Sequence, residues 1–256
     1  MIGIVGLGYV GSSLLGTLLN NNLNVIAVDI NSSRASELRK KFDTPKLVIG
    51  TNFEDLQRAE KVVIAVPTPL NSKREPDLSA LIKVIESISN NLKPGTLVIN
   101  ESTSYPGTLR NLIAAKLHGN YEFAAAPERV DPASPNWNIR NTPRLVSGLT
   151  PNATKRAVEF YSQFCDKVIP VSSPEVAEAA KLLENTFRQV NIALVNEFAQ
   201  IAEKFGISAN ETIQAAATKP FGFMPFIPGI GVGGHCIPVD PSYLNYAVEE
   251  LGGSAD

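Results

Sequence analysis

A cysteine in the last part of the chain lies in a setting that suits nucleophilic chemistry. Residues 229–241 read GIGVGGHCIPVDP, so four glycines and His235 precede Cys236, and Asp240 follows it. A glycine-rich backbone can approach a ligand closely, and a thiolate near a helix N-terminus is stabilised by the helix dipole. We therefore interpret Cys236 as a reactive nucleophile shortly before a helix that starts near Asp240.

Two other interpretations of Cys236 are weighed against this one. A buried cysteine often serves as a small apolar residue, but packing alone needs neither the glycines nor the neighbouring His235 and Asp240. One Cys beside one His lacks the four-ligand spacing of structural zinc, so we predict no metal site. Cys165 follows Phe164 in a helical pattern, and we interpret it as a packing residue.

A second motif, the G-x-G-x-x-G of Gly6, Gly8 and Gly11, follows the apolar residues 2–5 and opens a helical pattern. The first glycine permits a tight turn, the second lets the backbone approach a pyrophosphate, and the third lets helix and strand pack closely. The N–H groups at the helix N-terminus can then bind phosphate. Asp29 ends the next strand, where a carboxylate can accept hydrogen bonds from ribose hydroxyls.

The order of these features predicts a cofactor. Strand, glycine turn, helix and acid together favour a dinucleotide over a turn that only packs a helix. The Asp29 carboxylate would repel the 2'-phosphate of NADP, which favours NAD. Arg34, five residues farther along, could attract that phosphate and keeps the alternative open.

A third set of polar residues lies on a helix predicted from Pro174 to Phe205, a stretch without internal proline or glycine. At 1.5 Å per residue this helix would be roughly 48 Å long. Lys181, Asn185 and Arg188 are spaced so that they share one face of it. A solvated charged stripe has the same spacing, so the pattern by itself assigns these residues no function.

The elements that must position these residues alternate between strand and helix. Apolar runs predict strands over residues 2–5, 24–29, 61–66, 96–100, 122–125, 144–147 and 167–171. Helices are predicted over residues 12–20, 33–41, 78–88 and about 241–251, with further helix starts at Thr150-Pro151 and at Ser208. The pattern is typical of an α/β fold. We predict a Rossmann-type doubly wound sheet over residues 1–172, followed by a long central helix and a small helical domain over residues 173–256.

Composition restricts the classes of partner. The 256 residues are 44% hydrophobic, enough for a substantial core, and the net charge of -2 provides no basic field for nucleic acid or anionic lipid. The N-terminus enters a strand without a basic segment or a long apolar stretch, so we expect neither a signal peptide nor a membrane span. Two cysteines suit a reducing compartment, and we predict a cytoplasmic location.

Taken together, several motifs resemble the UDP-glucose/GDP-mannose dehydrogenase family. They follow one another over nearly the whole chain: VGLGYVG (5–11), VPTPL (66–70), ESTSYPGT (101–108), APERVDP (126–132), residues 181–207 and residues 219–241. GGHCIPVDP is similar to the branch that acts on UDP-N-acetylglucosamine or UDP-N-acetylmannosamine, and PERVDP favours the former. The resemblance implies NAD-dependent, four-electron oxidation of the sugar C6 hydroxymethyl to a carboxylate, a step of polysaccharide biosynthesis, by a homodimer formed through the long helix.

The resemblance also implies a role for the matching residues. Cys236 would capture the C6 aldehyde as a thiohemiacetal, which a second hydride transfer converts to a thioester. Lys181 would stabilise the developing oxyanion, and Asn185 would hydrogen-bond the reacting oxygen. Asp240 would steer or activate water in thioester hydrolysis. Glu128 and Thr103 would position substrate, cofactor or a proton-shuttling water.

Two binding sets follow from the same resemblance. The cofactor would contact Gly6, Leu7, Gly8, Tyr9, Val10, Gly11, Asp29, Arg34, Pro67, Thr68 and Thr103. The sugar nucleotide would contact Glu128, Arg129, Lys181, Asn185, Arg188, Phe226, Gly229, Gly231 and Gly233.

The sequence departs from the family pattern at three points. Relatives continue past residue 256 into another α/β domain that binds UDP, so we expect this chain alone to bind NAD but to turn over slowly. The stretch between the second strand and Val62 is shorter than in relatives, and Ile230 stands where the branch usually has proline. Two other functions stay open: a non-catalytic NAD-binding dimerisation fragment, and a two-electron dehydrogenase of the β-hydroxyacid type, which would have no use for Cys236.

Overall fold

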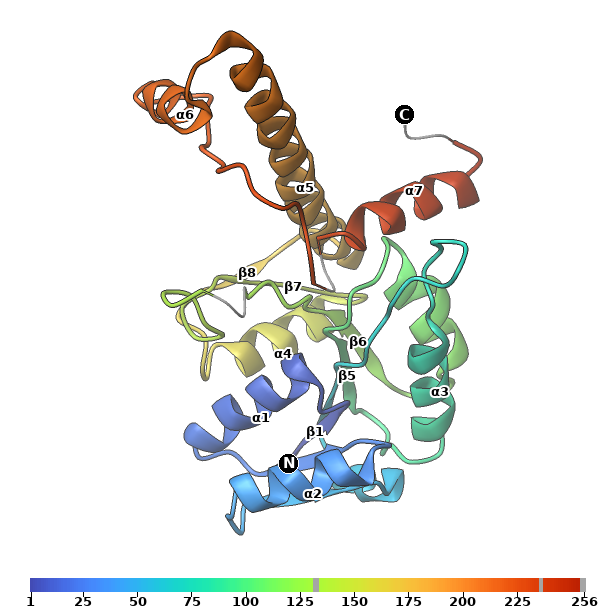
Figure 1. Cartoon of the computed structure of the whole chain (residues 1–256). Coiled ribbons are helices and arrows are strands. Elements are labelled where there is room, and N and C mark those ends of the chain that lie inside the picture. The colour runs from blue at the N-terminus through green and yellow to red at the C-terminus, as the bar shows by residue number, and fades with distance from the viewer. Residues whose placement is uncertain (131–133, 235–236, 254–256) are drawn as a thin grey trace. The chain divides into compact units, whose positions relative to one another are not determined.

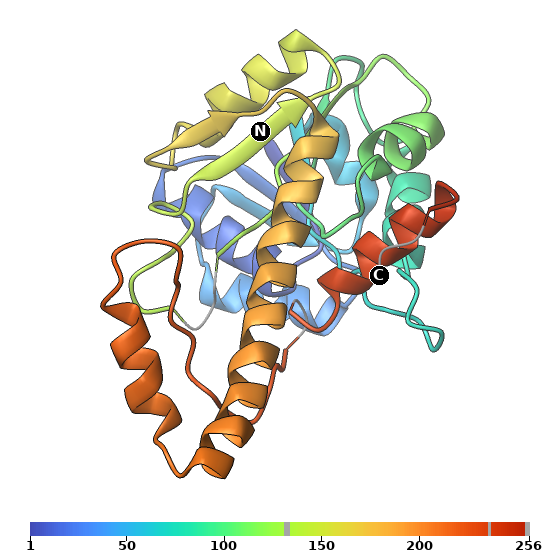
Figure 2. The ribbon, with the colours of Figure 1, turned by 90° about the horizontal axis from the view of Figure 1, so that it is seen from above.

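The computed structural model describes residues 1–130, 134–234 and 237–253 (Figures 1 and 2). The chain forms two compact units, Met1–Lys181 and Leu182–Asp256. Helix α5 (Pro174–Phe205) runs across the boundary between them. None of the helices in the described part of the chain combines the length and the apolar character that crossing a membrane requires.

The first unit is built on an eight-stranded sheet whose strands follow the order β3-β2-β1-β4-β5-β6-β7-β8. The strands are β1 (Ile2–Val5), β2 (Val25–Val28), β3 (Leu47–Gly50), β4 (Lys61–Ile64), β5 (Leu97–Asn100), β6 (Glu122–Ala125), β7 (Arg144–Gly148) and β8 (Val168–Pro170). Strands β1 to β6 pair in parallel, and β7 pairs antiparallel with β6. The chain leaves β1 on one side toward β2 and returns on the other at β4, which makes the carboxyl edge beside β1 and β4 the topological switch point where such sheets bind ligands.

Helices cover both faces of this sheet. Buried side chains of α1 (Tyr9–Asn20), α2 (Ser32–Lys41) and α4 (Pro151–Tyr161) join one hydrophobic core with the strand residues that point toward them. Helix α3 (Ser79–Ile88) and the π-helical segment η2 (Leu109–Ala114) lie on the opposite face (Figure 1). Strands β1, β2 and β5 are buried along their whole length and β4 and β6 at three of four residues, as continuous apolar runs in a parallel sheet require. The edge strand β3 is less covered, and of its residues only Ile49 is fully buried.

The predicted fold class is confirmed, and three local differences are informative. Strand β3 and the 3-10 segment η1 (Phe53–Arg58) are additions that the pattern did not predict. Helix α1 begins at Tyr9, earlier than residue 12, because Gly11 fits inside its first turn. The prediction that Cys165 lies in a helix is wrong: α4 ends at Tyr161, and Cys165 follows it as a buried core residue.

In the second unit, α5 continues to Phe205 as predicted. Gly206 then adopts a φ of 67°, which a glycine tolerates, and Ser208 caps α6 (Ala209–Ala217) by accepting a hydrogen bond from the Glu211 amide. Helix α7 (Asp240–Glu250) closes the unit, and its first residue is the acid that the sequence placed at a helix start.

Candidate active site

The glycine loop after β1 has the geometry of an anion site. Gly6 has a φ of 90°, and an added Cβ there would lie 2.5 Å from the Ala65 carbonyl oxygen. At Gly11 an added Cβ would lie 1.9 Å from the Gly6 carbonyl oxygen, so the first helical turn closes onto the loop only without a side chain. Gly8 differs from both, because its Cβ would meet nothing within 4 Å. The bare surface at Gly8 is therefore free for a pyrophosphate.

The other groups of this loop fit a dinucleotide as well. Gly8 is the N-cap residue of α1, and no side chain in the described chain caps that end, so its amides remain available to a phosphate. Asp29 holds the loop by accepting hydrogen bonds from the Leu7 and Asn31 amides, at 2.6 and 2.8 Å. Leu7 is buried, whereas Tyr9 is exposed and Val10 is half-buried.

Arg34 lies against the same loop. Its Nε donates to the Leu7 carbonyl at 2.9 Å, and its Nη2 donates to the Ser12 hydroxyl at 3.2 Å. Its Nη1 forms an ion pair with Glu37 at 2.8 Å. Because Glu37 already offsets this charge, Arg34 is poorly suited to a 2'-phosphate, and the loop fits NAD better than NADP.

A matched pair of alanine substitutions separates the two glycine roles. Gly8→Ala should leave stability unchanged but weaken NAD binding at least about tenfold, because the methyl group stands where the pyrophosphate approaches. Gly11→Ala should lower the free energy of unfolding by about 1–3 kcal/mol or more, because its methyl group overlaps the Gly6 carbonyl. Thermal unfolding and calorimetric NAD titration of both variants check this. Equal NAD affinity in Gly8→Ala and the parent would contradict the assignment.

The loops after β4 and β5 meet at the same edge of the sheet. The Val66 amide donates to the Ser102 hydroxyl at 2.9 Å, and the Thr68 hydroxyl donates to the Thr103 carbonyl at 2.9 Å. Pro67, between the two contacts on the first loop, is exposed. The parallel pairing of β4 with β5 thus unites the predicted cofactor residues Pro67, Thr68 and Thr103.

The predicted catalytic lysine lies next to this edge. Lys181 on α5 is 7% exposed, and its Nζ donates to the Thr103 hydroxyl at 2.6 Å. No carboxylate in the described chain forms an ion pair with it, so the buried ammonium remains free to stabilise a developing negative charge. The structure therefore unites Lys181 and Thr103, which are 78 residues apart in the sequence.

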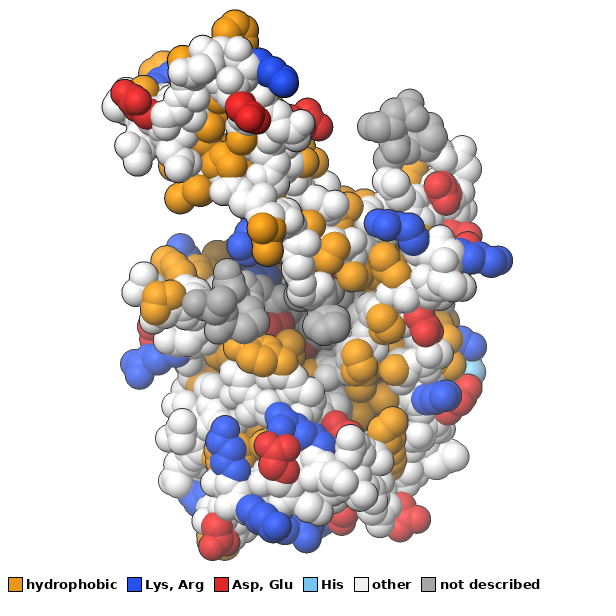
Figure 3. Space-filling model, in the orientation of Figure 1, with side chains coloured by type: hydrophobic (Ala, Val, Ile, Leu, Met, Phe, Trp, Pro, Cys, Tyr) orange, Lys and Arg blue, Asp and Glu red, His pale blue; other side chains and the backbone are white. Residues whose placement is uncertain are grey.

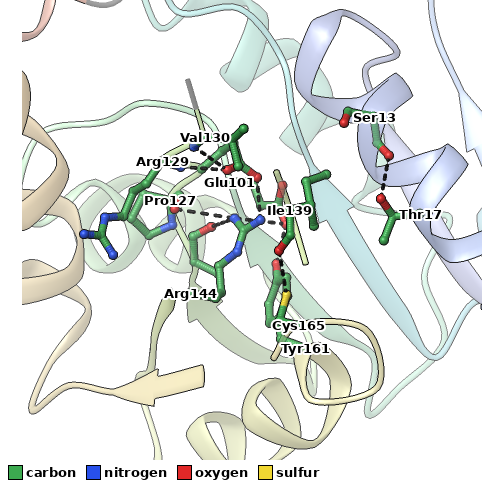
Figure 4. Close-up of polar contacts among 12 residues, drawn as sticks. Ser13, Thr17, Glu101, Pro127, Arg129, Val130, Ile139, Arg144, Tyr161 and Cys165 are labelled. Carbon is green, nitrogen blue, oxygen red and sulfur yellow. Dashed lines mark hydrogen bonds and ion pairs between the residues drawn. The ribbon is translucent and has the colours of Figure 1, made fainter. Parts of the chain in front are cut away.

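Glu128, after β6, belongs to a buried charged network that the sequence did not reveal. Arg144 on β7 forms ion pairs with Glu128 and, at 3.7 Å, with Glu101. Tyr161 donates to Glu101 at 2.5 Å, and its ring packs against the Arg144 guanidinium at 5.0 Å. Figure 4 shows the Arg144 guanidinium pointing toward Glu101 and Pro127 with Tyr161 and Cys165 beside it. Two acids thus share one arginine in the interior.

The two acids differ in their ionisation. Burial opposes the charge of Glu128, but Arg144 and the amides of Arg129 and Val130 outweigh burial and lower the pKa of this carboxyl. Burial dominates at Glu101 and raises its pKa to about 7 in spite of Arg144. Glu128 is therefore a fixed carboxylate that shapes its loop, and Glu101 is protonated in weak acid.

This difference predicts a pH dependence of stability. Glu101 binds a proton more tightly in the folded chain than in the unfolded chain, whose glutamate pKa is near 4.5, so its stabilising effect is complete below that value and is lost as the pH rises through about 7. Glu101→Gln should flatten the decline in unfolding free energy between pH 5 and pH 8 by on the order of 2–3 kcal/mol. Urea unfolding at several pH values measures it, and Glu159→Gln, on the exposed face of α4, is the control. An unchanged slope in Glu101→Gln would contradict the shift.

Glu178 is a further residue that the sequence analysis did not single out. It lies on α5, is 2% exposed, and accepts hydrogen bonds from the segment that follows Thr103. A signal was present, because Glu178 precedes Lys181 by three residues and shares its helical face. Arg144 and Tyr161 carried no comparable signal, because their partners depend on which strands are neighbours.

In the second unit, two predicted catalytic residues meet. The Asn185 amide donates to the Asp240 carboxylate at 2.6 Å, and Asp240, at the start of α7, is fully buried. The Gly229 amide donates to the Asn196 side chain at 2.8 Å, and the Phe226 ring packs against Phe187 at 6.0 Å. The glycine-rich loop is thereby attached to α5.

The remaining predicted residues lie in both units. Arg129 donates to the Pro143 carbonyl at 2.9 Å, so it lies along the β7 side of the first unit. Arg188, Gly231 and Gly233 are exposed, and a Cβ at either glycine would meet nothing within 4 Å. The predicted nucleophile Cys236 and its neighbour His235 lie outside the described residues.

The sheet order, the bare glycine loop and the buried lysine together define a dinucleotide-binding protein of the Rossmann class. Two models of one family match it: the UDP-glucose/GDP-mannose dehydrogenase NAD binding domain over residues 38–165, and the central domain of the same family over residues 175–256. The TrkA-N domain model matches residues 2–66. The chain belongs to the UDP-glucose/GDP-mannose dehydrogenase family, and it carries the NAD-binding part of that family.

Individual relatives agree with this assignment. The chain is 38% identical to the UDP-N-acetyl-D-glucosamine 6-dehydrogenase of Pseudomonas aeruginosa, over 98% of this chain and 64% of the relative. It is 38% identical to the UDP-N-acetyl-D-mannosamine dehydrogenase of Methanocaldococcus jannaschii, over 94% and 60%. Among solved structures, the UDP-D-ManNAc dehydrogenase of Pyrococcus horikoshii superposes with a TM-score of 0.87 at 33% identity, over 94% of this chain and 63% of that one. The chain therefore spans less than two thirds of the length of these relatives.

Proposed function

We propose that this chain supplies the NAD-binding and catalytic parts of an enzyme that oxidises the C6 hydroxymethyl of a UDP-sugar to a carboxylate. Residues 1–172 would bind the cofactor, and residues 173–256 would carry the cysteine loop and the dimer contact. The observation that carries the proposal is the buried Lys181 ammonium on Thr103, at the carboxyl edge of a sheet with a bare glycine loop. Relatives named as UDP-N-acetyl-D-glucosamine and UDP-N-acetyl-D-mannosamine dehydrogenases support a UDP-N-acetylhexosamine as substrate.

Bound NAD would supply the hydride acceptor for both oxidations. Lys181 would stabilise the negative charge that develops on the C6 oxygen when the hydroxyl loses its proton, since a buried donor acts strongly where water is excluded. Thr103, which accepts the hydrogen bond from Lys181, keeps that amine directed at the edge of the sheet. Glu128 would position the substrate as a permanently charged acceptor, because Arg144 lowers its pKa.

The second oxidation would depend on Cys236. Its thiolate would add to the C6 aldehyde, whose oxygen would take up a proton to give a thiohemiacetal. Loss of the C6 hydride to the cofactor and of the hydroxyl proton would then give a thioester. Water then attacks the thioester carbonyl, which releases the sugar acid and returns the thiol. Asp240 would orient that water, and its hydrogen bond with Asn185 supports a fixed carboxylate in this role. A reducing compartment such as the cytoplasm would keep the thiol free.

The ratio of NADH formed to UDP-sugar consumed tests the proposal. UDP-N-acetylglucosamine and UDP-N-acetylmannosamine should each be assayed by absorbance, with the sugar product identified by mass spectrometry. Two NADH per sugar acid support the cysteine pathway. One NADH with an aldehyde or ketone product would favour a two-electron dehydrogenase, and NAD binding without turnover of either sugar would favour a non-catalytic fragment.

We also propose that the chain forms a homodimer through α5. Exposed apolar residues recur on one face of this helix at intervals of three, four and seven: Leu183, Phe187, Val190, Leu194, Ile201 and Phe205. Figure 3 shows hydrophobic side chains gathered on the visible face over α5 and α6. Such a stripe matches a second copy of itself by knobs-into-holes packing, which supports a helix-to-helix contact between two identical chains.

A charge placed on this stripe should dissociate the dimer. Leu194→Glu buries a carboxylate in the contact, so the sedimenting species should shift from two chains to one at micromolar concentration. Gln200→Glu adds the same charge on another exposed face of α5 and should leave the mass unchanged. Sedimentation equilibrium measures the mass of each variant. A parent chain that sediments as a monomer would reject the proposed helix-to-helix contact.

A further inference from the structure

Both oxygens of a buried carboxylate bind the segment that carries Thr103. Glu178 Oε1 accepts hydrogen bonds from the Ser104 hydroxyl at 3.2 Å and from the Leu109 amide at 3.0 Å. Oε2 accepts from the Gly107 amide at 2.7 Å. The carboxylate thereby binds amides at the start of η2, where the helix dipole favours a negative group. These contacts fix residues 104–109 on α5.

Lys181 holds the other end of the same segment. It follows Glu178 by three residues on one face of the helix, and its Nζ binds the Thr103 hydroxyl at 2.6 Å. Helix α5 is rigid over one turn, so the position of residues 104–109 on Glu178 determines where Thr103 meets the lysine amine. Gly107 supports this arrangement with a φ of 95°, a backbone conformation that side chains other than glycine rarely adopt.

We propose that Glu178 is a positioning residue that sets the contact between Lys181 and Thr103, and that it thereby governs kcat rather than ligand binding. The inference rests on the proposed function, in which Lys181 stabilises the reacting oxygen. The charged groups facing Glu178 are Glu175 on α5 and Arg110 on η2. Arg110 forms its ion pair with Glu175, at 2.8 Å, and not with Glu178. Burial raises the pKa of Glu178 to about 7, against the hydrogen bonds from Leu109, Gly107 and Ser104 that lower it. These three hydrogen bonds are the contacts that hold the side chain.

Glu178→Gln tests the positioning role directly, because a glutamine amide cannot accept hydrogen bonds at both of its terminal atoms. If its NH2 group takes the place of Oε2, it opposes the Gly107 N–H, and in the other orientation it opposes the Leu109 N–H. Either way one donor is left facing another donor, and the segment must shift. Glu175→Gln is the matched control, since Glu175 lies one turn earlier on α5, is more exposed, and pairs with the exposed Arg110 side chain.

The expected result combines kinetics with a double-variant cycle. Glu178→Gln should lower kcat at least about tenfold, since small misplacement of a catalytic group is costly, while KM and the Kd for NAD stay within about twofold. In a Lys181→Met background the same substitution should change kcat by less than about twofold, because its effect passes through Lys181. Glu175→Gln should match the parent. An unchanged kcat in Glu178→Gln, or an equal loss in both backgrounds, would overturn the proposal.

A second measurement does not depend on turnover. Hydrogen exchange at the Gly107 and Leu109 amides, and acetylation of Lys181 followed by mass spectrometry, should both speed up in Glu178→Gln and not in Glu175→Gln. Failure of the parent protein to form NADH from any UDP-sugar would reject the proposed function. Unchanged exchange and acetylation in Glu178→Gln would reject the positioning role.

Discussion

Replacing Cys236 with serine is expected to lower the rate of sugar-acid formation by roughly a thousandfold or more and to leave NAD binding unchanged. A serine hydroxyl is almost entirely protonated at neutral pH and adds to an aldehyde far less readily than a thiolate. The covalent route to the thioester is thereby closed. NAD binding depends on the glycine loop and Asp29 in the other unit, so its affinity should match that of the parent.

Cys165→Ser is the matched control, because Cys165 differs in each property that a nucleophile needs. Its side chain is 6% exposed, its Sγ donates to the Ile139 carbonyl at 3.3 Å, and burial raises the pKa of its thiol to about 11. Cys165→Ser should therefore keep the parent rate. Both variants are measured by NADH absorbance and by the amount of sugar acid formed. Sugar acid produced at the parent rate by Cys236→Ser would show that this cysteine is not the nucleophile.

The second large effect is expected at Arg144. Changing it to methionine removes the arginine with which Glu101 and Glu128 form their buried ion pairs, which should lower the free energy of unfolding by about 3–5 kcal/mol. The pKa of Glu128 should rise at the same time, because Arg144 is the main group that lowers it. Urea unfolding at pH 7 measures the loss.

Arg140→Met is the control for Arg144→Met. The Arg140 side chain is 77% exposed and pairs with Asp166 at 3.0 Å, so its removal should cost at most about 1 kcal/mol. The triple variant Arg144→Met, Glu101→Gln, Glu128→Gln removes the charges together and should recover most of the stability that Arg144→Met loses. Equal losses in Arg144→Met and Arg140→Met would contradict a buried charge network.

Local signals account for the parts of the fold that the sequence predicted. Residues 174–205 were recognised as one helix because proline begins the stretch and no glycine or proline interrupts it. The Ser208 cap and the glycine turn after β1 are likewise encoded by neighbouring residues. Strand β3 was not predicted, although its run Leu47–Gly50 is as long as that of β1, because a short apolar run shows no period that separates strand from other structure.

The residues of the candidate site also fall into those that local sequence predicts and those that only tertiary packing brings together. The glycine loop with Asp29 could be predicted, since its chemistry follows from spacing within one βαβ unit. The contact of Glu178 with residues 104–109 could not, because it joins positions about 70 residues apart through the packing of α5. Local patterns carry no information about which side chain lies across such a distance.

Glu101 and Glu128 show, within one pair of residues, what the sequence determines and what only the tertiary structure decides. The sequence determined on its own that both are acids just after predicted strands, and it determined the cofactor loop and the family. Only the tertiary structure decided that Glu128 is held charged while burial raises the pKa of Glu101 to about 7. Strands β5, β6 and β7 are neighbours in the folded sheet, and this adjacency brings Arg144 closer to one acid than to the other.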